Sequence, residues 1–157
     1  MNAQESRGRM IITALAGLIL TIFPLPETVA LVRPAFLALV VLYWSTAVPR
    51  AGGIELGWFS GFALDAFQGP VLGEHALALA LIAFIAVHEH QRFRSKPLFQ
   101  QSLMVLAMLG LYELCLFLFD SWTGHPVSNP ARWFPVLTGA LLWPPASVIL
   151  TQVTVRR

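Results

Sequence analysis

Long apolar runs alternate with short stretches that contain proline, glycine or charged residues. Six such runs predict membrane-spanning helices at residues 10–23, 28–48, 53–67, 71–88, 98–119 and 134–153. A helix needs about 20 apolar residues to cross a bilayer, so the first of these runs is short for a full crossing. The pattern predicts an all-α integral membrane protein, in which residues 1–157 form one transmembrane domain built as a bundle of six transmembrane helices.

The breaks between the runs predict where the chain turns. Pro24 and Pro26 follow the first run, and the second contains Arg33, which lies near its start and is expected to snorkel to the lipid head groups. Residues 68–70, Gln-Gly-Pro, predict a very tight turn between the third and fourth helices. In the last run Pro144 and Pro145 are expected to kink the helix, because each removes a backbone donor.

Composition supports the membrane assignment. The chain has 157 residues, of which 57% are hydrophobic and 11% are charged, whereas about 25% of residues are charged in an ordinary globular domain. The longest clearly polar segment, Asp120 to Arg132, is too short to fold as a separate aqueous domain. The single cysteine, Cys115, lies within an apolar run and has no partner for an internal disulfide.

The basic residues predict the orientation of the chain. With six crossings and a cytoplasmic start, eight of the ten basic residues fall in cytoplasmic segments: Arg7, Arg9, Arg50, Arg92, Arg94, Lys96, Arg156 and Arg157. The positive-inside rule therefore favours a multi-pass inner-membrane protein with both termini in the cytoplasm. Most of the five tryptophans fall near predicted helix ends, as in an interfacial aromatic belt.

The most charged segment is residues 88–97, HEHQRFRSKP. Its basic residues, Arg92, Arg94 and Lys96, follow an apolar helix directly. Basic clusters beside a membrane helix are typical of contact with anionic lipid head groups. We therefore expect membrane lipids, and no nucleic acid, as partners of this segment.

Small residues form a stripe on the third predicted helix. Gly53, Gly57, Gly61 and Asp65 follow at a spacing of four, which puts them on one helical face. Gly57 and Gly61 form a GxxxG pair, which lets another helix backbone come close in a membrane. This face is predicted to pack against a partner protein or against a neighbouring helix of the same chain, and not to carry chemistry.

Ionisable residues within apolar runs are costly and therefore suggest a role. Asp65 and Glu113 lie deep enough to be candidates for a buried structural contact or a partner contact. Glu55 and Glu74 lie near helix ends and are expected to be ordinary interfacial residues, since a helix N-terminus favours a carboxylate such as Glu74.

Motifs for catalysis or cofactor binding are missing from the sequence. His88 and His90 are two residues apart, so they point away from each other on a helix, and no cysteine or further histidine is near to complete a metal site. His75 is interpreted as a helix-start residue. The chain has no phosphate-binding loop, nucleophile elbow or Ser/His/Asp arrangement. The prediction is a protein without catalytic residues, metal or cofactor.

The order and spacing of several short motifs identify a family. They are Ser6 to Arg9, Pro24-x-Pro26 with a following acid, Arg33-Pro34, the run from Leu37 to Trp44, Ala47-Val48-Pro49, Gly61 with Leu64-Asp65, Gly69, Leu72-Gly73, Ala76-Leu77-Ala78, Gln91, Phe93-Arg94, Leu98 with Gln100-Gln101, and Leu142-Trp143-Pro144. Over nearly its whole length the chain resembles the MreD family of rod shape-determining membrane proteins.

The resemblance implies a function that is not enzymatic. A family member is expected to be an inner-membrane scaffold of the bacterial cell-elongation machinery, which binds an MreC-like protein and acts, indirectly, with the MreB filament and cell-wall synthase complex. Together these would direct lateral peptidoglycan synthesis and rod shape. The family is also similar in fold to the substrate-binding subunits of energy-coupling-factor transporters, which are six-helix bundles.

Two alternatives follow from other protein classes. A small-molecule-binding membrane subunit of a transporter would need polar residues that converge on an outward-facing pocket, and the short outer loops offer few. A membrane enzyme such as a lipid-modifying hydrolase would need a nucleophile with a base, which the sequence does not supply.

Overall fold

The computed structural model describes residues 3–68, 71–124 and 129–155, and these residues form helices without any β-strand. The α-helices are α1 (Ala3–Ile22), α2 (Glu27–Ala30), α3 (Phe36–Ala47), α4 (Ile54–Gln68), α5 (Glu74–His88), α6 (His90–Arg94), α7 (Leu98–Trp122) and α8 (Phe134–Val155), and a 3₁₀ helix, η1 (Pro130–Trp133), precedes α8.

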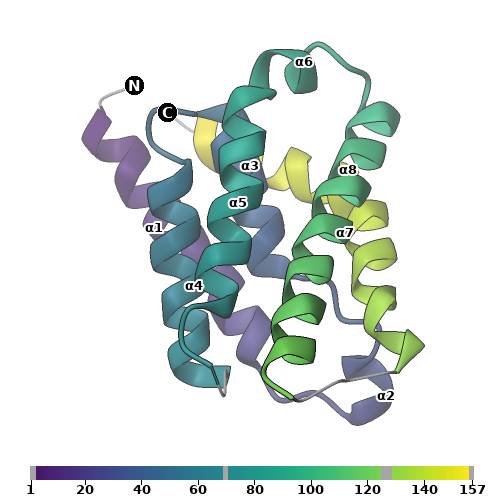
Figure 1. Cartoon of the computed structure of the whole chain (residues 1–157). Coiled ribbons are helices and arrows are strands. Elements are labelled where there is room, and N and C mark those ends of the chain that lie inside the picture. The colour runs from purple at the N-terminus through teal and green to yellow at the C-terminus, as the bar shows by residue number, and fades with distance from the viewer. Residues whose placement is uncertain (1–2, 69–70, 125–128, 156–157) are drawn as a thin grey trace.

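The long helices run side by side and alternate in direction (Figure 1). The start of α1, the end of α8 and the short helix α6 lie at one end of the bundle, which we call the α6 end. Helix α2 and the end of α7 lie at the other, which we call the α2 end. Two antiparallel pairs, α4 with α5 and α7 with α8, make the most extensive helix contacts.

Helix α3 lies at the centre of the bundle. All of its residues from Leu37 to Thr46 are buried, and it contacts α1, α4, α5, α6 and α8. Helices that are apolar all round belong inside a protein or a membrane, and α3 is covered by its neighbours. The outer helices instead expose large apolar side chains, such as Ile12 on α1, Phe59 on α4 and Leu141 on α8.

Two helical stretches are long and apolar enough to cross a membrane, Leu98–Trp122 and Pro130–Thr154. Phe36–Ala47 and Glu74–His88 are apolar but shorter. Together with the apolar exterior they give the molecule the character of a membrane protein. Six crossings remain a prediction from the sequence.

Residues 28–48 differ from the single helix that their hydropathy predicts. The chain forms α2, turns at Arg33 and Pro34, and begins α3 at Phe36. Proline disfavours helical backbone at the preceding residue, which explains the break. The Arg33 guanidinium donates hydrogen bonds to the carbonyl oxygens of Thr21 and Phe23. Arg33 therefore caps the end of α1, and its contact with lipid head groups stays a prediction.

Two tryptophans are core residues and not part of an interfacial belt. Trp44 and Trp143 are 0% and 1% exposed. The indole Nε1 of Trp44 donates to Thr13 Oγ1 at 2.8 Å, and that of Trp143 donates to Gln101 Oε1 at 3.2 Å. Trp44 ends up inside because α3 is enclosed along its whole length. Trp58, Trp122 and Trp133 are exposed.

The α6 end is held together by contacts between distant parts of the chain. Phe93 of α6 is buried and packs edge-on against Trp143, with ring centroids 5.4 Å apart. Helix α8, which contains Pro144 and Pro145, bends so that its second half runs toward α3 and α1 (Figure 1). There Arg9 Nη1 donates to the carbonyl oxygens of Val153 and Thr154, at 3.1 and 3.0 Å. This caps α8 and joins it to α1.

Candidate functional site

The glycine stripe of α4 faces α5. A Cβ atom added to Gly57 would lie 2.6 Å from the carbonyl oxygen of Leu79, and one added to Gly61 would lie 2.5 Å from Cα of Ala76. Such distances are impossible for real atoms, so the two backbones touch and only glycine fits at either position. Close approach of this kind is the usual role of a GxxxG pair in a membrane protein.

Gly53 is a glycine for a different reason. It precedes α4 and has a φ of +111°, a left-handed conformation that other residues rarely adopt. A Cβ there would lie 3.4 Å from Val87 Cγ2, an ordinary contact. Gly53 thus forms the turn between α3 and α4, whereas Gly57 and Gly61 set the distance between helices.

Asp65 continues the stripe and caps α5. Its carboxylate is 2% exposed and accepts hydrogen bonds from the backbone N–H groups of Gly73 at 2.9 Å, His75 at 3.0 Å and Ala76 at 3.2 Å. The Nδ1 atom of His75 lies 2.8 Å from Asp65 Oδ1, so His75 donates to the same carboxylate. A side chain of α4 therefore satisfies the first N–H groups of α5, which a helix cannot bond internally.

Glu74 lies beside this cap. It is 6% exposed, contrary to the expectation of an interfacial residue, and its Oε1 lies 3.5 Å from Nδ1 of His75. Its other oxygen, Oε2, is buried and has no hydrogen-bond partner among the described residues. His75 also faces α7, with its ring centroid 6.2 Å from that of Tyr112.

A second group of charges links α7 to η1. Nε of Arg132 donates to Glu113 Oε1, and Nη1 of Arg132 lies 2.6 Å from Asp120 Oδ2. All three side chains are largely buried. The guanidinium carbon of Arg132 also lies 5.7 Å from the ring centroid of Phe117. Glu113, a candidate from the sequence, is thus paired with Arg132, which the sequence did not single out.

Both groups lie at the α2 end, and Glu74 is within electrostatic reach of Asp120 and Arg132. We call the set the polar cluster: Asp65, Glu74, His75, Glu113, Asp120 and Arg132. The sequence offered one signal for the pairing of Glu113 with Arg132. Helices α7 and α8 form a hairpin, so an acid before the turn and a base after it are placed to meet across it.

The basic residues of α6 and its following turn are placed differently. Arg92, Arg94 and Lys96 are all exposed at the α6 end, at the opposite end of the bundle from the polar cluster. Arg92 pairs with Glu89 on the surface, with Nη1 and Oε2 3.2 Å apart. Arg94 lines a cavity between α3, α6, α7 and α8.

The polar cluster has the features of a structural network. Within the part of the chain that the structure describes, no group of three or more His, Cys, Asp and Glu side chains is arranged to hold a metal ion. The contacts of Asp65 and Arg132 join α4 to α5 and α7 to η1, and their chemistry is hydrogen bonding and charge pairing.

The family model described as "MreD: rod shape-determining protein MreD" matches residues 6–153. The chain belongs to the MreD family. A rod shape-determining protein MreD from Haemophilus influenzae is 29% identical over 135 residues, which cover 86% of this chain and 83% of the relative. No solved structure matches the chain. MreD is a structural, shape-determining family and is not known as an enzyme family, so a role in the rod shape-determining system follows. A resemblance to energy-coupling-factor subunits stays a prediction.

Proposed function

We propose that the protein is a multi-pass scaffold of the bacterial inner membrane that binds an MreC-like protein and helps direct lateral peptidoglycan synthesis. The MreB filament and the cell-wall synthases are then linked to it indirectly. Membership of the MreD family supports a role in the rod shape-determining system. The large apolar side chains exposed on the outer helices support a location in the membrane. No catalytic step is part of the proposal.

The observation that carries the proposed orientation is the distribution of basic residues between the two ends. Among the described residues, the α6 end has Arg7, Arg9, Arg50, Arg92, Arg94 and Lys96, and the α2 end has Arg33 and Arg132. The two at the α2 end are bonded within the protein, Arg33 to α1 carbonyls and Arg132 to Glu113 and Asp120. The positive-inside rule then supports an α6 end, with both termini, in the cytoplasm.

The packing of the glycine stripe affects which surface of the protein is free to bind a partner. Because Gly57 and Gly61 are covered by α5, we propose that this face is an internal packing face and that the MreC-like protein contacts another surface. Asp65 and Glu113 are proposed to stabilise the fold, since their carboxylates bond α5 and Arg132 respectively.

Co-purification tests the scaffold proposal. The tagged protein and its Gly61→Leu variant are extracted from cell membranes in mild detergent, and the MreC-like protein recovered per molecule is measured. We expect recovery with the wild type, and less variant protein in the membrane but an unchanged ratio of partner to protein. Absence of the partner from the wild type contradicts the scaffold. A variant present at the normal amount that has lost its partner makes the glycine stripe a partner face.

Replacement of candidate chemical groups tests the non-enzymatic part. Glu55 and His88 are ionisable, and Glu55 is exposed on α4 without belonging to the polar cluster. Glu55→Gln and His88→Ala, each expressed at the native level in place of the wild type, are expected to maintain rod-shaped cells. Round cells for both variants at normal protein levels would contradict the absence of a chemical role.

The alternative, a small-molecule-binding subunit of a transporter, has less support. It predicts a polar pocket that faces outward. The polar-lined cavity beside Arg94 opens at the α6 end, which is the cytoplasmic end in the proposed orientation.

A further inference from the structure

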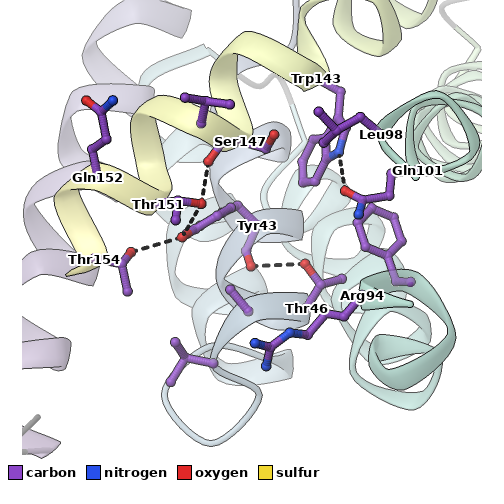
Figure 2. A pocket seen from close by; sticks show the side chains of 14 residues that line it. Tyr43, Thr46, Arg94, Leu98, Gln101, Trp143, Ser147, Thr151, Gln152 and Thr154 are labelled. Carbon is purple, nitrogen blue, oxygen red and sulfur yellow. Dashed lines mark hydrogen bonds between the residues drawn. The ribbon is translucent and has the colours of Figure 1, made fainter. Parts of the chain in front are cut away.

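A cavity of about 480 Å³ opens at the α6 end between α3, α6, α7 and α8. Figure 2 shows the side chains from these four helices that line it. The described residues that line it include one cation and seven neutral polar side chains and no acid: Arg94, Tyr43, Thr46, Gln101, Ser147, Thr151, Gln152 and Thr154. A cavity with a cation and without a carboxylate favours an anionic ligand.

One wall of the cavity is fixed by hydroxyl groups that bond each other and the backbone. The Tyr43 hydroxyl lies 3.1 Å from Thr154 Oγ1 and 3.3 Å from Thr151 Oγ1, and the threonine hydroxyls donate to carbonyl oxygens of α8 (Figure 2). On the α7 side, Gln101 is held by Trp143 and by the Lys96 carbonyl. These groups form a preorganised polar surface, because their hydroxyl and amide groups already donate hydrogen bonds within the protein.

Arg94 of α6 is the remaining cationic donor. Its side chain makes no hydrogen bond or ion pair within the described part of the chain, and it lines the cavity. Figure 2 shows the Arg94 side chain extending from α6 beside Thr46. A guanidinium offers a planar fork of donors that matches the oxygens of a phosphate.

The remaining lining is apolar and suits the part of a lipid next to its head group. Val48, Leu98 and Val148 contribute to the wall. The cavity also lies where an apolar bundle ends and exposed basic residues begin, which is the level of the head groups in a bilayer. A ligand that is both anionic and apolar therefore fits better than a soluble ion.

We propose that this cavity binds the phosphate of an anionic phospholipid, such as phosphatidylglycerol, with Arg94 donating to the phosphate oxygens and the glycerol region lying against the apolar lining beside it, which includes Leu98. We assign this lipid to the cytoplasmic leaflet, and that assignment rests on the proposed orientation. The binding itself does not, because it is measured on the purified protein.

The test compares Arg94→Met with Arg92→Met, which removes the same charge from the same short helix. The sequence also assigned Arg92 to lipid contact, but Arg92 pairs with Glu89 on the surface and does not line the cavity. Its variant therefore separates binding in the cavity from the general attraction of the basic segment for anionic lipid. The full-length proteins are placed in nanodiscs of phosphatidylcholine with increasing phosphatidylglycerol, and bound lipids are counted by native mass spectrometry after release. Loss of a charge-assisted contact predicts a Kd for phosphatidylglycerol about tenfold higher for Arg94→Met. For Arg92→Met we expect a change of less than about twofold.

Thermal unfolding of each variant checks that the fold is retained. Equal effects of Arg92→Met and Arg94→Met would overturn the site, as would equal retention of phosphatidylglycerol and phosphatidylcholine by the wild type. Inorganic phosphate is titrated in parallel. If millimolar phosphate binds and phosphatidylglycerol does not, the lipid assignment is contradicted.

Discussion

Among single residues, Asp65 makes the most contacts that a substitution would break. Its carboxylate accepts from three backbone N–H groups of α5 and from His75. Asp65→Asn keeps one acceptor oxygen and is expected to lower the free energy of unfolding by about 1 kcal/mol, whereas Asp65→Leu leaves several donors without a partner and is expected to lower it by about 3 kcal/mol. Unfolding in detergent micelles measures both.

Glu55→Gln is the control for this comparison, because Glu55 is an exposed acid on the same helix. It is expected to change the unfolding free energy by less than about 0.5 kcal/mol. If Asp65→Leu proved as stable as Glu55→Gln, the cap of α5 by Asp65 would not exist.

Arg132 illustrates a buried charge with two partners. Arg132→Gln leaves Glu113 and Asp120 largely buried without a counter-charge, and the expected loss is about 2 kcal/mol or more. The double variant Glu113→Gln with Arg132→Gln is expected to recover at least about 1 kcal/mol of that loss, since one unpaired charge is then removed. A double-mutant cycle by thermal unfolding measures the coupling.

The surface pair Glu89 and Arg92 serves as the reference for that cycle. Their side chains are 36% and 79% exposed, so their coupling is expected to be below about 0.5 kcal/mol. Additive effects of the Glu113 and Arg132 substitutions, equal to those of the surface pair, would contradict the assignment of the α7 to η1 link.

At the scale of helices, the α4 and α5 pair depends on two glycines. Gly61→Ala would force a methyl group against the backbone at Ala76, so we expect a loss of about 2 kcal/mol from overpacking. Gly110, in the middle of α7, has no atom within 4 Å of a Cβ position. Gly110→Ala is therefore expected to be neutral or to stabilise the helix by up to about 1 kcal/mol. Unfolding that ranks the two variants in the reverse order would show that the two backbones do not touch.

The sequence was informative about these helices where the pattern was local. The spacing of Gly57 and Gly61 predicted close helix approach, and Pro24 and Pro26 marked the end of α1. The turn predicted at residues 68–70 lies, except for Gln68, outside the described residues. The sequence did not identify which helix packs against the glycine stripe, because residues four apart define a helical face but not the element that covers it. The break at Pro34 was noted in the sequence but not interpreted as the end of a helix.

Contacts between distant residues were harder to predict. Glu74 and Trp44 were expected near the membrane surface, and both are buried because neighbouring helices cover them. Glu113 was selected for its depth alone, and its pairing with Arg132 depends on how α7 and η1 meet. The cavity beside Arg94 likewise combines side chains more than 100 residues apart, such as Tyr43 and Thr154, which no spacing in the sequence brings together.

For the whole molecule, we propose that the α6 end of the bundle, with both termini, lies in the cytoplasm. This orientation places the basic residues next to the anionic leaflet and places the polar cluster on the outer side. Ser95 at the α6 end and Thr123 after α7 are both exposed, and they mark the opposite ends.

Thiol labelling of these two positions tests the claim most directly. Ser95→Cys and Thr123→Cys are each made in a Cys115→Ser background, and spheroplasts are treated with a membrane-impermeant maleimide before and after permeabilisation. We predict that the cysteine at 123 reacts in intact spheroplasts and that the cysteine at 95 reacts only after permeabilisation. Reaction at 95 but not at 123 in intact spheroplasts would contradict the account.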